Sequence, residues 1–237
     1  MAAFVQNLLT GQSKTAGTSL GITGSATITL GNTLIIAFTI DDVGSGFGAT
    51  DNLGNTYTLQ KTTTSVGNIK TLIFSAPVTV AGTLTTQTIS WTTSATAKAG
   101  VSAEFSNVGT VRLTGGSDGT GTTANISINI AANDTSFFSG ELWVGAHGTE
   151  NTNTSSNTGE GITKGTPTQT IHDGLKNGTT GGSVSSNVNV RLAYILIDAN
   201  STANADLETT VSSSSKNAGA GIVFNAPVAS SQWFLLF

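Results

Sequence analysis

Carboxylates are scarce in this chain, so the positions where they gather are the first candidates for chemistry. The 237 residues contain thirteen Asp and Glu residues in total. Asp41 and Asp42 follow a strongly apolar segment, and Asp51 begins the turn that comes next. Because Ca²⁺ prefers hard oxygen ligands on flexible loops, Asp41, Asp42 and Asp51 form a candidate calcium site. The alternative is a local role, since Asp side chains in turns often hydrogen-bond the nearby backbone.

Groups suited to acid–base or nucleophilic catalysis are few. The segment Gly17-Thr18-Ser19-Leu20-Gly21 has the spacing of a hydrolase nucleophile elbow, but that motif needs a helix directly after the serine. The sequence after it is rich in Thr and Ile and predicts a strand instead. A serine triad or a histidine metal site would have to use His147 or His172, and Asp173 stands beside the latter. We expect no enzymatic activity, and no cofactor other than the Ca²⁺ considered above.

The composition argues against several classes of partner. Only 9% of the residues are charged and the formal net charge is −4, whereas a typical soluble domain has about 25% charged residues. Binding to nucleic acid phosphates needs a surplus of Lys and Arg, so no nucleic-acid partner is expected. The chain has no cysteine, which excludes disulfides and thiolate metal sites. A hydrophobic fraction of 37% is still enough for a folded core.

The elements that must position these residues are predicted to be strands. Apolar and polar residues alternate, and clusters of Gly, Asn, Asp and Ser interrupt them, which is typical of an all-β protein. Residues 34–38 and 192–197 are apolar throughout and predict central strands covered on both faces. In the segment 99–105, the alternation predicts that Phe105 points inward while Ser102 and Glu104 face solvent. The expected strands are 26–30, 33–40, 56–61, 70–75, 86–91, 99–105, 124–130, 141–147, 168–172, 189–198, 207–211 and 221–224. The expected fold class is an antiparallel β-sandwich, jelly-roll-like.

The two halves of the sequence resemble each other. The matching segments are Leu72–Ser75 with Leu192–Ile195, Gly31–Leu34 with Ser139–Leu142, and Phe105 with Phe224. This similarity predicts an internal twofold repeat, with a first β-sandwich half or domain at 1–109 and a second at 110–237. The Gly-rich stretch 115–121 is expected to form a linker or a long crossover between them. Chance similarity between stretches of so few residue types is the alternative.

An apolar segment, 231–237, is the candidate contact element of the second half. It contains five consecutive large apolar residues: Trp233, Phe234, Leu235, Leu236 and Phe237. Contiguous exposed apolar surface usually marks a contact site, so these five residues are the candidate interface with a neighbouring subunit. The alternative is that they form a last strand or cover the core of their own chain.

The beginning of the sequence bears on where the protein is made. Residues 1–9 lack the basic n-region and the long apolar run of a secretion signal. No stretch of the chain approaches the roughly 18 apolar residues of a membrane-spanning helix. We therefore expect synthesis in a cytoplasm and no membrane insertion.

Four motifs resemble parts of a known kind of module. They are Gly31–Phe38, Asp51–Tyr57, Ile73–Pro77 and Ala103–Val108, of which the Asp-x-x-Gly-Asn-Thr-Tyr motif at Asp51–Tyr57 is the most specific. Together they resemble the Gly/Thr-rich, jelly-roll-like β-sandwich modules of tailed-phage virion proteins and bacterial surface proteins. The resemblance implies a structural or adhesive role, and the missing secretion signal favours the virion.

Two functions are therefore expected. The first is a virion structural protein, either a capsid decoration protein, a head fibre or a tail adhesin, that forms a homo-oligomer and binds other capsid or tail proteins. Few charges mean little desolvation penalty when large surfaces meet. The alternative is a lectin-like carbohydrate-binding module that recognises glycans on the host surface.

Overall fold

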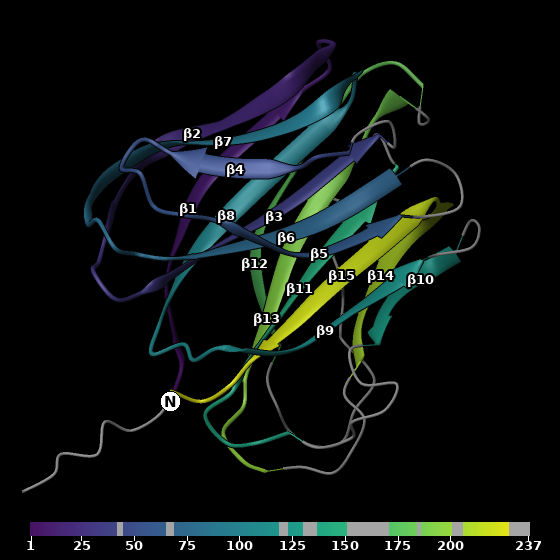
Figure 1. Cartoon of the computed structure of the whole chain (residues 1–237). Coiled ribbons are helices and arrows are strands. Elements are labelled where there is room, and N and C mark those ends of the chain that lie inside the picture. The colour runs from purple at the N-terminus through teal and green to yellow at the C-terminus, as the bar shows by residue number, and fades with distance from the viewer. Residues whose placement is uncertain are drawn as a thin grey trace, which may run out of the picture.

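The protein is built from antiparallel strands, which confirms the predicted all-β, sandwich-like class (Figure 1). The computed structural model describes residues 1–41, 45–64, 69–118, 123–129, 137–150, 171–183, 186–200 and 206–227. The strands are β1 (Ala3–Ser13), β2 (Gly17–Ile28), β3 (Thr33–Asp41), β4 (Gly48–Asp51), β5 (Thr58–Thr64), β6 (Ile69–Pro77), β7 (Gly82–Ala95), β8 (Lys98–Ser106), β9 (Val111–Asp118), β10 (Thr123–Asn129), β11 (Leu142–Thr149), β12 (Ile171–Gly178), β13 (Asn189–Leu196), β14 (Asp206–Ser215) and β15 (Asn217–Phe224). Within these ranges no helix is long and apolar enough to cross a membrane.

The first half forms a single curled sheet. Its eight strands follow the order β4-β7-β2-β1-β8-β3-β6-β5. The edge strands β4 and β5 contact each other, so the sheet nearly closes on itself. β1 and β2 share only one registered pair, Thr10 with Thr23. Beyond this short pairing, β2, β7 and β4 fold over one face of β8, β3 and β6 (Figure 1).

The second half forms a five-stranded sheet and a separate two-stranded ribbon. The sheet has the order β12-β13-β11-β15-β9, and β10 pairs with β14 in the ribbon. Figure 1 shows the five-stranded sheet between the curled sheet and the ribbon. β8 ends at Ser106 and β9 begins at Val111, on either side of the expected boundary between residues 109 and 110.

Among the described residues, three apolar clusters hold these layers together. The first lies inside the curled sheet and includes Leu34, Ile36, Phe38, Phe74 and Trp91. The second joins the curled sheet to the five-stranded sheet and includes Ile35, Val101, Phe105, Val144, Leu192 and Ile222. The third lies between the five-stranded sheet and the ribbon and includes Ile128, Trp143, Ala193, Ile195 and Val223. β3 and β13 contribute to two clusters each, which confirms that residues 34–38 and 192–197 are covered on both faces.

The expected orientation of β8 is half wrong. Phe105 points into the cluster between the two sheets, as expected, but Ser102 and Glu104 are also fully buried. The Ser102 hydroxyl accepts a hydrogen bond from the Leu9 N–H at 3.1 Å. Alternation distinguishes the two faces of a strand but not whether water reaches the second one, and here the curl of the sheet brings β2 over that face, with Ile22 next to Gly100.

Glu104 is buried as a hydrogen-bonded carboxylate rather than as one member of an ion pair. Its Oε1 accepts hydrogen bonds from the Thr29 N–H at 2.8 Å and from Asn32 Nδ2 at 2.7 Å. Its Oε2 accepts one from Gln6 Nε2 at 2.7 Å. The carboxylate therefore fixes the turn before β3 and the neighbouring strand β1 to β8.

The strand pairings of the second half follow those of the first. The pairs β9–β15, β15–β11, β11–β13, β13–β12 and β10–β14 correspond to β1–β8, β8–β3, β3–β6, β6–β5 and β2–β7. Among the described residues, β4 and the β1–β2 pairing have no counterpart. The strand orders therefore differ overall, and the internal twofold repeat stays a prediction.

The turns before the two central strands also match. Gly31 and Gly140 have φ values of 84° and 92°, a left-handed conformation that glycine adopts without strain. The Gly31 N–H donates to the Val78 carbonyl at 3.0 Å, and the Gly140 N–H donates to the Ile197 carbonyl at 2.7 Å. The N–H groups of Val78 and Ile197 each return a bond to the residue after the glycine, at 2.8 and 3.0 Å. These paired turns hold β3 and β11 at the same end of the molecule.

Candidate functional site

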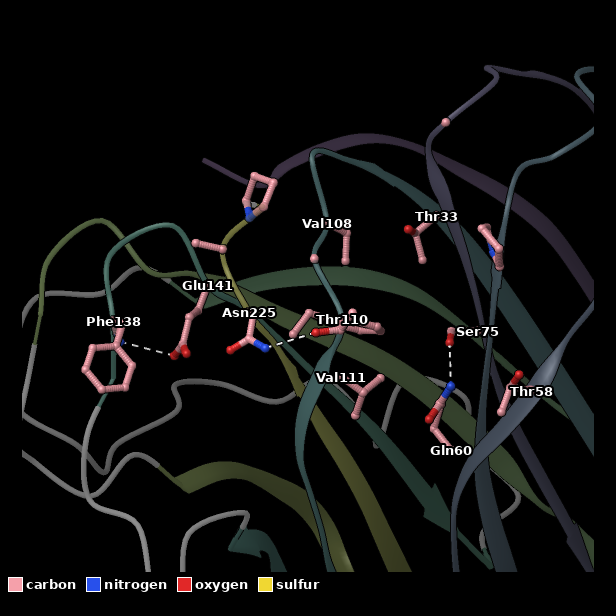
Figure 2. A pocket seen from close by; sticks show the side chains of 16 residues that line it. Thr33, Thr58, Gln60, Ser75, Val108, Thr110, Val111, Phe138, Glu141 and Asn225 are labelled. Carbon is pink, nitrogen blue, oxygen red and sulfur yellow. Dashed lines mark hydrogen bonds between the residues drawn. The ribbon is translucent and has the colours of Figure 1, made fainter. Parts of the chain in front are cut away.

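A groove opens at the end of the molecule where β3 and β11 begin and β6, β8 and β15 end; we call this the groove end. Its volume is about 870 Å³, within the usual range for ligand sites of about 300–1,000 Å³. Thr58, Gln60 and Ser75 on β5 and β6 form one wall. The β8–β9 connection and the residues after β15 form the other (Figure 2).

The second wall is fixed by backbone contacts around Gly109. Its N–H donates to the Asn225 carbonyl at 3.1 Å, and the Asn225 N–H donates to the Thr110 carbonyl at 2.8 Å. A Cβ at Gly109 would lie 2.5 Å from that Asn225 oxygen, so only glycine allows the two segments to approach so closely. The chain between the halves is thereby held against the end of β15.

Two side-chain amides face the groove from opposite walls (Figure 2). Gln60 Nε2 donates to the Ser75 hydroxyl at 2.9 Å, and Asn225 Nδ2 donates to the Thr110 hydroxyl at 3.1 Å. Each bond orients its amide and uses one N–H. The carbonyl oxygen and the second N–H of each amide are the groups that an occupant of the groove would meet.

An ion pair between Arg112 and Glu141 lies at the edge of the groove, next to Phe138. Arg112 Nε is 2.7 Å from Glu141 Oε1, and Arg112 Nη2 donates to Glu141 Oε2 at 3.1 Å. The Phe138 N–H also donates to Oε2 at 3.1 Å, and the Arg112 guanidinium lies 5.4 Å from the centre of the Phe138 ring. Glu141 is 1% exposed and Phe138 is 50% exposed. The pair neutralises its own charges and holds an aromatic ring at the groove's edge.

The floor of the groove is apolar. Val108, Val111 and Phe224 line it, and all three pack on the cluster between the two sheets. Pro77 and Pro227 lie among the lining residues as well. The groove therefore combines a floor continuous with the core and walls bearing amides and hydroxyls.

The candidate calcium ligands are not brought together as far as the structure describes them. The Asp41 carboxylate accepts a hydrogen bond from the Ala97 N–H at 3.3 Å, beyond the end of β7, whereas Asp51 pairs with Gln87 within β7. The part of β7 between these two positions, residues 87–95, extends roughly 26 Å at about 3.3 Å per residue, so Asp41 and Asp51 lie far apart. Asp42 lies outside the described residues. No group of three or more His, Asp or Glu side chains suited to a metal occurs in the described part of the chain.

Asp51 has a local role that its motif explains. Its Oδ1 accepts hydrogen bonds from the N–H groups of Leu53, Gly54 and Asn55 at 2.7–3.0 Å. Its Oδ2 accepts one from Asn55 Nδ2 at 3.0 Å and one from the Tyr57 hydroxyl at 3.1 Å. Burial raises the pKa of Tyr57 well above its usual value, so this hydroxyl stays protonated and donates. The Asp51–Tyr57 motif is thus a turn organised around the Asp51 carboxylate, and Asn55 also ties it to the turn after β6.

Asp41 lies at the opposite end of the molecule, where β3 and β11 end and β8 and β15 begin; we call this the polar end. Lys98 is buried there and donates to the carbonyl groups of Thr15 and Ala95. Lys216 Nζ lies 3.4 Å from Glu150 Oε2. Burial raises the pKa of both Asp41 and Glu150 and outweighs the opposing influence of Lys216 on each.

These raised pKa values predict how stability depends on pH. The folded protein binds protons at Asp41 and Glu150 more readily than the unfolded chain does, so both groups lower the free energy of unfolding as pH rises from about 4 through their folded-state pKa values. Asn cannot ionise at position 41. We therefore expect the free energy of unfolding of Asp41→Asn, measured with urea, to fall less between pH 4 and pH 8 than that of the wild type. Adding Glu150→Gln should reduce the fall further. Equal slopes in all three proteins would contradict the assignment.

The candidate nucleophile Ser19 and the two histidines lie on three different strands. Ser19 is exposed on β2, and the strand continues past it without the helix that a nucleophile elbow needs. His147 is fully buried on β11. The His172 ring, on β12, stacks on Tyr194 at 5.0 Å between ring centres. The Asp173 side chain and the contact segment 231–237, with Trp233, Phe234, Leu235, Leu236 and Phe237, lie outside the described residues.

The sequence did not predict the groove. Its amides are single residues on a strand and after a strand, with no motif around them. Two signals were present: Gly109 between the halves, and the pair Phe137-Phe138 ahead of a predicted strand. Neither shows that β5 and the end of β15 face each other across a gap, because that depends on how the two sheets stack.

Comparison with known proteins adds no relative. No family model, curated protein or solved structure matches the chain. The groove is therefore interpreted from its own geometry.

Proposed function

We propose that the protein is a structural component of a phage virion, a capsid decoration protein, head fibre or tail adhesin, that acts by self-association and by docking on other virion proteins. It works by binding rather than by catalysis. The virion setting comes from the resemblance of motifs such as Asp51–Tyr57, and assembly before host lysis would take place in the host cytoplasm.

The observation that supports docking is the uneven placement of exposed apolar side chains. Among the described residues, the large apolar side chains that are exposed are Met1, Val5, Leu30, Leu59, Val80 and Phe138. All six lie at the groove end: at the start of β1, in the turns before β3 and β11, at the start of β5, and in the turn after β6. Apolar side chains gathered at one end are typical of a contact surface. The chain also leaves the second sheet at this end, through residues 225–227, toward the segment 231–237.

Deleting residues 231–237 tests the proposal. We expect the shortened protein to keep the wild-type unfolding transition, because the deletion leaves in place every described side chain of the three apolar clusters. Its self-association, measured by sedimentation, should fall, and it should be lost from purified particles. Unchanged assembly would contradict the role of the segment, and a full-length chain that stays monomeric and off particles would contradict the proposed function.

A carbohydrate-binding function is the second candidate, and the walls of the groove are the observation in its favour. Thr33, Thr58 and Ser75 offer hydroxyls, and Gln60 and Asn225 offer amides, without a surplus of charge. Such groups suit a neutral saccharide. A glycan array probed with wild type and with Asn225→Ala distinguishes this function, which predicts binding that the substitution weakens.

A further inference from the structure

We propose that the groove receives the apolar segment 231–237 of a second copy of this chain. The inference rests on the proposed function in one respect, because both require the protein to self-associate. It adds the receptor site: an extended segment of one copy lies between the β5–β6 wall and the residues after β15 of the other.

The chemistry of the groove suits an extended apolar peptide. Val108, Val111 and Phe224 provide an apolar floor, on which alternate side chains of a strand-like segment would pack. An extended backbone also carries N–H and C=O groups that need partners once they leave water. The amides of Gln60 and Asn225 face such a backbone from both sides, each oriented by a neighbouring hydroxyl.

The charge and the aromatic content of the segment match as well. Residues 231–237 carry no charged side chain, and the charges at the groove, on Arg112 and Glu141, are already paired with each other. The half-exposed Phe138 ring offers an edge or face to an aromatic side chain. Aromatic pairs of this kind stabilise a contact beyond the effect of their buried area. Three of the seven residues in the segment are aromatic.

The position of the segment along the chain brings it within reach. Pro227 itself lines the groove, and Trp233 follows six residues later. Six extended residues span about 20 Å, which is enough to cross to an adjoining molecule. The chemistry and the starting point therefore identify this segment as the occupant.

Two features favour the groove of a second copy over that of the same chain. A return into its own groove requires a reversal within Val228-Ala229-Ser230-Ser231-Gln232, where only the two serines belong to the residue types that tight turns favour. In addition, a twofold pair of copies joined at their groove ends would exchange segments reciprocally. The same pairing would cover exposed apolar residues such as Leu30, Leu59 and Phe138.

The absence of cysteine from the chain allows a direct test. Thr110 is exposed at the groove, and Thr18 is exposed near the polar end, at the start of β2. We would mix full-length Thr110→Cys with full-length Leu235→Cys, oxidise the mixture and separate the products on a non-reducing gel. The matched control mixes Thr18→Cys with Leu235→Cys. We expect a heterodimer disulfide with Thr110→Cys and at least about tenfold less with Thr18→Cys.

Two further variants keep the result decisive. Thr110→Arg places a long charged side chain in the groove and should weaken self-association in sedimentation about tenfold or more, without moving the unfolding transition. In the double variant Thr110→Cys/Leu235→Cys, a disulfide within single chains at high dilution would overturn the inference in favour of the chain's own groove. Displacement of the segment by neutral hexasaccharides of glucose, galactose or N-acetylglucosamine would overturn it in favour of a glycan.

The outcomes separate this inference from the proposed function. Self-association without the Thr110 crosslink and without any effect of Thr110→Arg would overturn the groove as receptor and leave the virion role standing. A full-length chain that remains monomeric at all concentrations would overturn both.

Discussion

Gly148→Ala should lower the free energy of unfolding by about 3 kcal/mol or more. The reason is that Gly148, on the five-stranded sheet, packs directly against a pair of hydroxyls on the curled sheet. On the curled sheet, the hydroxyls of Thr39 and Thr71 are buried and hydrogen-bond each other at 3.2 Å. A Cβ at Gly148 would overlap both hydroxyl oxygens and lie 2.7 Å from the Thr39 methyl group. The substitution must therefore push the sheets apart or break the buried bond, and urea unfolding measures the loss.

A second glycine provides the control for Gly148. Gly21 also lies within a strand, but a Cβ there would meet only methyl groups of Thr23 and Thr86 at 3.9 Å, an ordinary contact. Gly21→Ala should leave stability unchanged or raise it slightly, since alanine restricts the unfolded chain. In a Thr39→Ala/Thr71→Ala background, Gly148→Ala should lose most of its effect. An equally large effect there would show that the overlap with the hydroxyls is not the cause.

Glu104→Ala should lower the free energy of unfolding by about 3–4 kcal/mol, because it removes the shared acceptor of three partly buried hydrogen bonds. The Thr29 N–H and the amides of Gln6 and Asn32 would lose a bond to a carboxylate at once. Glu104→Gln keeps the volume and one acceptor oxygen but turns an NH₂ group toward these donors, so its effect should be intermediate. Denaturant unfolding at neutral pH measures all of these variants.

Gln6→Ala is the control that distinguishes the effect of losing the carboxylate from the effect of losing one of its donors. This variant removes one donor, and Glu104 keeps its bonds to Thr29 and Asn32, so the expected loss is only about 1 kcal/mol. If Glu104→Ala proved as mild as Gln6→Ala, the carboxylate would not be the centre of this hydrogen-bonded group.

The alternation of residues predicted the strands whose two faces differ in burial or are both apolar. Residues 34–38 and 192–197 could be identified as central because no polar residue interrupts them. β1, β4, β9 and most of β2 were not predicted, because their apolar residues are interrupted by Gly, Asn or Asp, which are depleted in strands. Their pairing depends on the strands beside them, which a local pattern does not show.

Glycine was the main source of error between the halves. The stretch 115–121 reads as a linker, but its first residues belong to β9, which pairs with β15 up to Asp118. Gly116 is needed there, since a Cβ would overlap the Thr63 hydroxyl and lie 3.2 Å from Cε of Lys61. A glycine that serves close packing of sheets looks the same in sequence as one that serves a turn.

The candidate site could be predicted only in its local parts. The turn made by Asp51 was among the alternatives, because an Asp followed by Gly and Asn favours hydrogen bonds to its own backbone. The groove depends on the stacking of β5 against the segment after β15, more than 150 residues later in the chain. No short-range pattern encodes that separation.

All eight strands of the curled sheet lie within residues 3–106, which has a consequence for synthesis on the ribosome. Domains generally fold as units and the N-terminal part first, so this sheet can be complete while the rest of the chain is still being made. Until β11, β13 and β15 emerge, its outer face, with Ile35, Val101 and Phe105, stays uncovered. The nascent chain therefore has a period in which chaperones or neighbouring nascent chains can bind that face, and it ends when the second half docks.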